Sequence, residues 1–267
     1  MKSLKQHHGG TDYSVILDKL GLKSGQKIVA LWGYPDPLVL QDIRKKYPDH
    51  LVVDLDISYG VLESKFLPDN YCQIITNMVD NALAMQDKIE VIVASVGEEK
   101  CDQGRFAAYI LEHIGFSVVK TRYSEYAYPA EPLIISVSDM PLKQKVLSIM
   151  DTILEPDLVG KLKLNKVSPT NGFWGVPPND LDILDLFPPT THVYGWTRCV
   201  EAKRPADIDI EMYVDESVPT VFFAQTFCAK MQLAKYLAKK HDGLYVDVDD
   251  SMNVSVRAKI EAFLRLS

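Results

Sequence analysis

The hydrophobic pattern of this chain alternates between two periods. Short apolar runs rich in β-branched residues predict buried strands, and stretches whose apolar residues recur every three or four positions predict helices. In the first part of the chain the predicted strands are 27–32, 51–57, 90–96, 116–122 and 133–137, and the predicted helices are 38–46, 70–85, 106–113 and 142–154. Strands that alternate with helices predict an α/β fold, Rossmann-like, with mostly parallel sheets that carry helices on both faces.

The pattern changes over residues 155–178, where proline and glycine are frequent and periodicity is weak. Such a stretch predicts a domain boundary, which we place near residue 157. Residues 1–157 then form a Rossmann-like α/β domain, and residues 158–267 a second, smaller α/β domain with a Gly/Pro/aromatic loop at 168–178. The second half predicts helices at 181–187, 228–240 and 254–266, and strands at 192–196, 209–214, 220–223 and 244–248.

The stretch 17–63 carries the first candidate chemistry, as a strand, a tight turn, a helix and a second strand. Asp36 is a sound N-cap for the helix, and Pro37 suits its first turn. Asp54 and Asp56 lie on one face at the carboxyl end of the second strand. A helix N-terminus attracts negative or polar groups, and an acid at this point accepts hydrogen bonds from ribose hydroxyls. The stretch predicts half of a nucleotide-binding fold.

Residues 22–28 (LKSGQKI) and 51–62 (LVVDLDISYGVL) resemble the opening of a class I S-adenosylmethionine-dependent methyltransferase. The resemblance implies a Rossmann-like domain that binds S-adenosylmethionine through Gly33, Tyr34, Asp36, Asp54 and Asp56. Where that family carries a glycine-rich loop, this chain has Leu-Trp-Gly-Tyr-Pro-Asp-Pro at 31–37, with one glycine. Prolines and a tyrosine there prevent the usual close approach of the backbone to a cofactor.

Two internal similarities are open to two interpretations, a duplication or the chance similarity that is common between two β-α-β units. Residues 51–58 (LVVDLDIS) match 244–251 (LYVDVDDS) at an offset of 193, which also aligns helix 38–46 with 231–239. Residues 32–35 (WGYP) match 174–177 (WGVP) at a different offset. The two offsets cannot both come from one simple duplication.

The second half contributes further candidate residues. Trp174 lies in a rigid loop of glycines, prolines and aromatics, where an aromatic face could stack on adenine. His192, Tyr194 and Arg198 lie on or just after one predicted strand. A His–Tyr pair can perform general acid–base catalysis, and an arginine can bind a carboxylate or phosphate. We expect these three as catalytic candidates.

Composition narrows the function classes. A net charge of −7 and a pI of 5.4 argue against nucleic-acid binding by bulk electrostatics. No apolar run is long enough to span a membrane, and the N-terminus lacks the apolar region of a signal peptide. Four scattered cysteines without a C-x-x-C pair fit a cytoplasmic setting and predict no metal site. Apolar and tyrosine-rich surfaces are compatible with a homodimer.

The sequence therefore predicts an enzyme that uses a nucleoside cofactor, with S-adenosylmethionine-dependent methyl transfer to a small molecule as the first choice. One alternative is an NAD(P)-dependent or a nucleotide- and metal-dependent enzyme that uses the D-x-D pair Asp54 and Asp56. The other is a non-catalytic Rossmann-like module for ligand binding or assembly, which the single-glycine loop favours.

Overall fold

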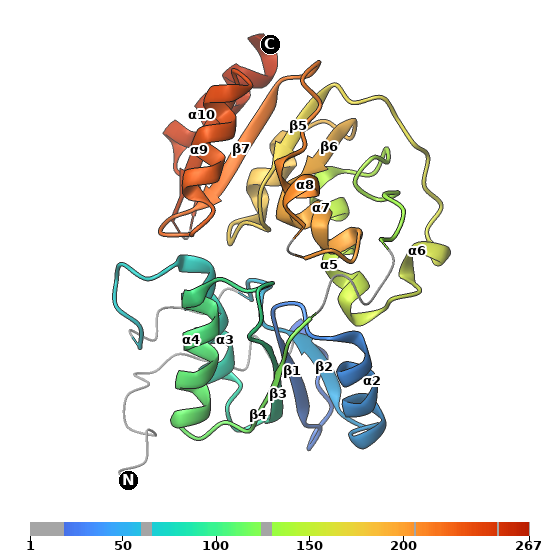
Figure 1. Ribbon diagram of the computed structural model, residues 1–267, viewed down its shortest axis with the longest axis vertical. Coiled ribbons are helices and arrows are strands. Elements are labelled where there is room, and N and C mark those ends of the chain that lie inside the picture. Colours follow the sequence, from blue (N-terminus) through green and yellow to red (C-terminus); the bar gives the residue numbers. More distant parts are fainter. Residues whose placement is uncertain (1–18, 60–65, 124–129, 206, 250, 267) are drawn as a thin grey trace.

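The computed structural model describes residues 19–59, 66–123, 130–205, 207–249 and 251–266, arranged as two α/β lobes (Figure 1). The first lobe, up to residue 123, consists of β1 (Ile28–Trp32), α2 (Pro37–Lys46), β2 (Leu51–Asp54), α3 (Gln73–Ala84), β3 (Ile89–Ser95), α4 (Asp102–His113) and β4 (Val118–Thr121). The second lobe, from residue 130, consists of α5 (Leu142–Leu154), α6 (Leu158–Lys161), β5 (Asn171–Trp174), the 3₁₀ helix η3 (Leu181–Leu186), β6 (Thr191–Tyr194), α7 (Trp196–Glu201), α8 (Ile208–Met212), β7 (Thr220–Gln225), α9 (Met231–Lys240), β8 (Leu244–Val248) and α10 (Val254–Leu266).

Each lobe contains one four-stranded sheet, and the two sheets have the same topology. The strand orders are β2-β1-β3-β4 and β6-β5-β7-β8, and every strand pair is parallel. In each sheet the second strand of the chain lies on one side of the first strand, and the third strand lies on the other side. A topological switch point therefore lies between β1 and β3, and another lies between β5 and β7. The prediction of a Rossmann-like α/β fold with parallel sheets is confirmed.

Local sequence explains the central elements of the first lobe. All five residues of β1 are fully buried, as expected for a parallel strand with neighbours on both sides. Asp36 caps α2 as predicted, because its Oδ1 accepts hydrogen bonds from the backbone N–H groups of Leu38 (2.9 Å) and Val39 (3.4 Å).

Among the described residues no helix has the length and apolarity needed to cross a membrane.

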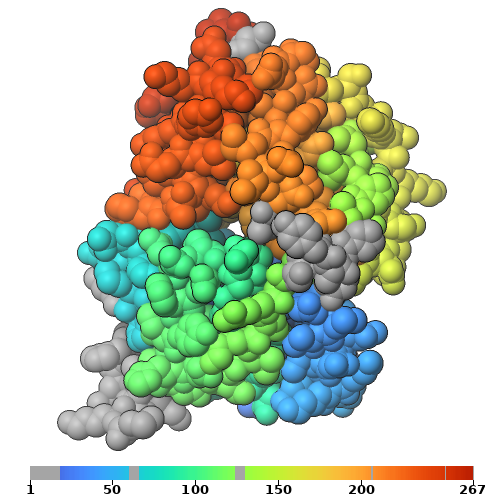
Figure 2. Space-filling view, in the orientation of Figure 1, coloured from blue at the N-terminus to red at the C-terminus, as the bar shows by residue number. Residues whose placement is uncertain are grey.

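The predicted boundary near residue 157 falls after α5, and it stays a prediction. Helix α5 packs against η3, β6 and α7 of the second lobe and also touches β2. One hydrophobic cluster runs through both lobes, from Val29 and Leu31 of β1 to Phe173 of β5 and Val193 of β6. The lobes therefore share part of their core. Figure 2 shows the surfaces of the two lobes in contact with each other.

Two predicted strands are wrong. Residues 133–137 form no strand, because the N–H groups of Ile134, Ile135 and Ser136 donate to the buried carboxylate of Glu201 at 2.7, 2.5 and 3.0 Å instead of to a neighbouring strand. Residues 209–214 lie largely in helix α8, which Asp207 caps by accepting a hydrogen bond from the Ile210 N–H at 3.0 Å. The short apolar alternation in both stretches resembles a strand, but side-chain carboxylates take the backbone donors.

The shared topology also decides between the two internal similarities. Strands β1 and β5 are equivalent, and they end in Trp32 and Trp174, so the WGYP and WGVP segments occupy corresponding places. The offset of 193 instead aligns β1 with β7 and β2 with β8, which hold different positions in their sheets. The Trp-Gly-x-Pro match is thus the one that agrees with the fold.

Candidate functional site

A cavity of about 560 Å³ lies between the two lobes. Its walls come from residues that follow the strands of both sheets: Asp56 after β2, Glu98–Cys101 after β3, Val176 and Pro177 after β5, Trp196 after β6, and Cys228–Lys230 after β7. Ligands of open parallel α/β sheets bind outside the carboxyl ends of the strands at the switch point. Because both sheets present this edge to the same cavity, we take the cavity, called the cleft below, as the candidate functional site.

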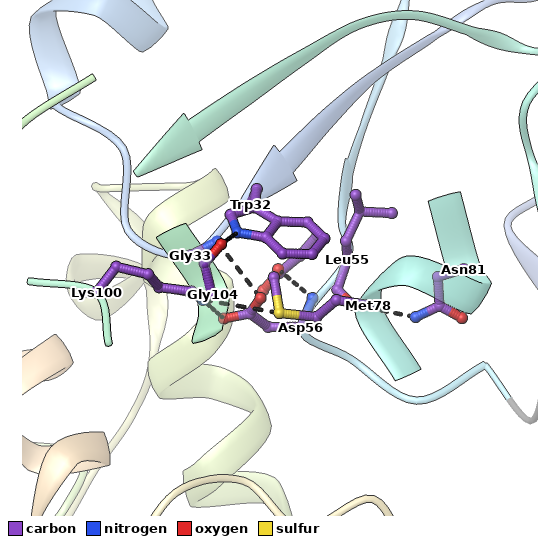
Figure 3. A network of polar contacts seen from close by, with 9 residues as sticks. Trp32, Gly33, Leu55, Asp56, Met78, Asn81, Lys100 and Gly104 are labelled. Atoms are coloured by element: carbon purple, nitrogen blue, oxygen red, sulfur yellow. Dashed lines mark hydrogen bonds and ion pairs between the residues drawn. The ribbon is translucent and has the colours of Figure 1, made fainter. Parts of the chain in front are cut away.

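The wall of the first lobe is organised around Asp56 and Lys100 (Figure 3). Asp56 accepts a hydrogen bond from the Gly33 N–H at 3.3 Å through Oδ1, and its Oδ2 lies 3.5 Å from Lys100 Nζ. The ammonium group is also 3.7 Å from the sulfur of Met78 and lies over the ring of Trp32, 5.8 Å from its centroid. Gly33 has a φ of +78°, and a Cβ atom there would lie 3.0 Å from Lys100 Nζ. Glycine at this position therefore allows the lysine to approach β1.

The wall of the second lobe carries a corresponding pair. Lys230 is the N-cap of α9, the helix equivalent to α4, and its ammonium group forms an ion pair with Glu211 of α8. The Glu211 backbone also accepts a hydrogen bond from the indole N–H of Trp174 at 2.7 Å, much as Gly104 of α4 accepts one from Trp32 at 3.0 Å. Each lobe thus presents a paired lysine and acid at the cleft, with a fully buried tryptophan in contact with the pair.

The cleft has an excess of acidic groups. Its lining contains four acidic residues, Asp56, Glu98, Glu99 and Glu211, and two lysines, each paired with one of the acids. Glu99 is buried, and its Oε1 accepts a hydrogen bond from the Gly97 N–H at 3.1 Å. The other oxygen, Oε2, is buried without a hydrogen-bond partner among the described residues. Glu99 lines the cleft, so its carboxylate is a candidate partner for a ligand there.

Among the residues predicted to bind a cofactor, Asp56 lines the cleft and Gly33 donates to it. Tyr34 is buried in the core, edge-on to Tyr123 with ring centroids 5.0 Å apart. Asp36 serves as the cap of α2, so its carboxylate closes the N-terminus of that helix. Asp54 is buried and accepts a hydrogen bond from the Asp56 N–H at 2.9 Å. Burial, followed by the charge of Asp56, raises the pKa of Asp54 well above its usual value.

The candidates in the second lobe lie together, but they are not among the residues that line the cleft. Trp174 was predicted to lie in the loop 168–178, but it ends strand β5 and is fully buried, so its faces pack in the core. The rings of His192 and Tyr194 have centroids 6.4 Å apart, and the guanidinium of Arg198 lies 5.4 Å from the Tyr194 centroid. His192 Nε2 contacts the carbonyl oxygen of Val167 at 2.9 Å, and burial lowers the pKa of His192. These three residues form one cluster on β6 and α7.

Sequence reasoning missed most of the groups that line the cleft, including Lys100, Glu99, Lys230 and Glu211. A signal existed, because an offset of 130 aligns Ala94 with Ala224 and Lys100 with Lys230, each within two residues of the start of a helix. Both segments read as ordinary polar turns until the shared topology shows that they are equivalent.

A scan against protein-family models and a search of curated proteins each found no match for this chain.

Proposed function

We propose that this protein is an enzyme that binds a nucleoside cofactor in the cleft, and that the cofactor is S-adenosylmethionine, used for methyl transfer to a small molecule. The observation that carries the proposal is the position of Asp56, after β2 and beside Gly33 at the switch point of the first sheet. In nucleotide-binding folds a carboxylate at this place accepts hydrogen bonds from ribose hydroxyls. Each carboxylate oxygen has two lone pairs, so Asp56 can accept from a ribose while it holds Gly33 and Lys100.

The charge of the cleft favours S-adenosylmethionine over a nicotinamide dinucleotide. The sulfonium and amino groups of S-adenosylmethionine are positive, and they suit a cleft with more carboxylates than lysines. A pyrophosphate needs free helix N–H groups or unpaired cations. At α2 those N–H groups are taken by Asp36, and both lysines of the cleft are paired with acids.

The metal-dependent alternative has less support. Asp54 and Asp56 do not face the cleft as a pair, because Asp54 is buried and its carboxylate accepts a hydrogen bond from the Asp56 backbone. Among the residues that the structure describes, no cluster of three or more His, Cys, Asp or Glu side chains could hold a metal.

Methyl transfer requires chiefly that the activated methyl group and the acceptor be aligned and shielded from water. The cleft supplies two walls for this, with apolar surface from Ile75, Val176 and Leu233. An acceptor that must lose a proton needs a base, and Glu99 Oε2 is a carboxylate oxygen of a cleft residue that has no hydrogen-bond partner among the described residues. We assign it that role.

A second candidate is a non-catalytic protein that binds a ligand between its lobes. The observation that favours it is the placement of His192, Tyr194 and Arg198 outside the lining of the cleft. Incubation with S-adenosylmethionine and a mixture of small nucleophiles distinguishes the two. Release of S-adenosylhomocysteine identifies an enzyme, and binding without release identifies the second candidate.

The proposal is tested by thermal-shift titration of the full chain with S-adenosylmethionine, S-adenosylhomocysteine, NAD(H), NADP(H) and UDP-sugars with manganese. A ligand that binds only the folded state raises the Tm once its concentration exceeds Kd. We expect a rise with the two sulfur nucleosides that is lost in Asp56→Asn and kept in Asp42→Asn, a control on the exposed face of α2. A rise with another nucleotide alone would contradict the cofactor assignment, and no rise with any ligand would contradict the nucleoside site.

The role of charge in the cleft can be tested separately. S-adenosylmethionine carries a sulfonium that S-adenosylhomocysteine lacks, so Glu99→Gln should weaken the first more than the second. An ion pair of about 1 kcal/mol corresponds to about fivefold in Kd. Gln keeps the acceptor for the Gly97 N–H, so the loop stays in place. Equal changes in both Kd values, measured by calorimetry, would contradict a role of the Glu99 charge in binding the sulfonium.

A further inference from the structure

Two cysteines from different lobes meet at the edge of the cleft. Cys72 is the N-cap of α3 in the first lobe, Cys228 follows β7 in the second, and both line the cleft. Their thiols are in hydrogen-bonding contact. The backbone ties the lobes together at the same place, because the Gln73 N–H donates to the Thr226 carbonyl oxygen at 3.3 Å. The two sulfur atoms are therefore held side by side by groups other than themselves.

The two thiols have different environments. Cys72 is 2% exposed, and its sulfur lies beside the Cys228 thiol and near the N–H groups of Ile74 and Ile75 at the start of α3. The hydrogen bond from Cys228 is the largest of the causes that lower the pKa of Cys72 to about 7; burial opposes it, and Lys100 assists it. The same hydrogen bond, together with burial, raises the pKa of Cys228. One sulfur thus has thiolate character, and the other is a protonated thiol beside it.

We propose that Cys72 and Cys228 form a redox-active dithiol, which a hydroperoxide oxidises to a disulfide that joins the two lobes. In the first step the Cys72 thiolate attacks the peroxide, the O–O bond breaks, and Cys72 becomes a sulfenic acid while hydroxide leaves. In the second step the Cys228 sulfur attacks the sulfenic sulfur, the S–O bond breaks, and water leaves with the Cys228 proton. The dithiol loses two electrons and the peroxide gains them.

A hydroperoxide is the oxidant that fits this geometry. The Cys72 sulfur is buried at the edge of the cleft, so a molecule of two heavy atoms reaches it more easily than a bulky disulfide. The other two cysteines lack this arrangement. Cys101 is exposed, whereas Cys199 is buried in the second lobe with a pKa that burial raises.

The proposed disulfide would link the two walls of the cleft covalently. Cys72 directly precedes α3 and Cys228 lies close to Lys230, so the bond would fix the separation of the groups that face a ligand. This role does not depend on which ligand the cleft binds. Failure of the nucleoside proposal would therefore leave it unaffected.

The test uses the full chain, reduced with dithiothreitol, desalted and treated with one equivalent of hydrogen peroxide at neutral pH. The remaining thiols are blocked with N-ethylmaleimide in denaturant, and the intact mass and a non-reducing peptide map are recorded. We expect loss of two of the four reactive thiols, a peptide that joins Cys72 to Cys228 within one chain, and reversal by dithiothreitol. Cys199→Ser and Cys101→Ser should give the same link.

In Cys228→Ser the sulfenic acid has no resolving thiol, so dimedone should label Cys72 and no link should form. A disulfide that includes Cys101, a bond between two chains, or retention of all four thiols would overturn the proposal. Peptide mapping of the wild-type chain decides the pairing by itself, so a variant that fails to fold does not obscure the result.

Discussion

The two lobes share a framework and differ in the connections that complete it. Both have the same strand order, a Trp-Gly-x-Pro segment after the first strand, and a lysine before the helix that follows the third strand. The acid that pairs with the lysine differs in origin: Asp56 comes from the loop after β2, and Glu211 from the added helix α8. The comparison shows that groups at the carboxyl ends of the strands keep their places while the partners around them change.

We expect the largest difference in stability between the lobes when the lysine of each cleft wall is replaced. Lys100 and Asp56 have side chains only 9% and 7% exposed, whereas Lys230 is 32% exposed beside a buried Glu211. Removing one member of a buried ion pair leaves an uncompensated charge, so Lys100→Met should lower the free energy of unfolding by about 3 kcal/mol. Water can reach the second pair, so Lys230→Met should cost about 1 kcal/mol. Urea unfolding measures both, and equal losses would contradict the difference in burial.

The tryptophans should behave alike. Trp32 and Trp174 are both fully buried, and each indole N–H donates to a helix backbone carbonyl. Replacement by Phe leaves the carbonyl without its donor and removes buried volume, at a cost of about 2 kcal/mol in each lobe. Denaturant titration of Trp32→Phe and Trp174→Phe measures both losses. A much larger loss of stability in one variant than in the other would contradict the equivalence of the two tryptophans.

Much of the fold follows from the sequence, but the site follows only in part. The apolar runs of β1 and β3, and the cap and proline of α2, were sufficient to predict their elements, because burial and capping act locally. Asp56 was predicted from its place at the carboxyl end of the predicted strand 51–57; the observed β2 ends at Asp54. Lys100, Glu99 and Lys230 were not, since their roles depend on two sheets that face each other across the cleft, and no local pattern encodes that arrangement.

The second strands of the two sheets differ in how their buried ionisable groups respond to pH. Burial raises the pKa of Asp54 on β2 and lowers the pKa of His192 on β6, so both groups favour the neutral form when folded. Stability from Asp54 is therefore present below the unfolded pKa of about 3.9 and is lost as the pH rises toward the folded pKa. Stability from His192 is lost as the pH falls below about 6.5.

Two variants separate these contributions. Asp54→Asn keeps an acceptor for the Asp56 N–H, and it should gain stability relative to wild type as the pH rises from acid to neutral. His192→Gln should gain relative to wild type as the pH falls below neutral. Thermal melts over a pH series measure both trends, and a trend of the opposite sign in either variant would contradict the assigned cause.

Among the groups compared, we expect the thiols to have the smallest effect on stability and the clearest difference in reactivity. The groups that interact with Cys72 are Cys228, Lys100 and the N–H groups of α3, and together with burial they set the pKa of Cys72 near 7. The rate at which hydrogen peroxide oxidises Cys72 should rise with pH as the thiolate forms and reach half its maximum near that value. Cys199, whose pKa burial raises, is the matched buried control and should stay unmodified. Quantitative mass spectrometry of both peptides gives the two profiles.

The proposed function requires one ligand to contact both lobes across the cleft. Hydrogen exchange of the full chain with and without S-adenosylhomocysteine tests it most directly, because exchange reports backbone protection segment by segment. The account predicts added protection in two segments at once, residues 97–104 of the first lobe and residues 226–234 of the second. Protection confined to one lobe, or protection elsewhere with neither segment changed, would contradict it.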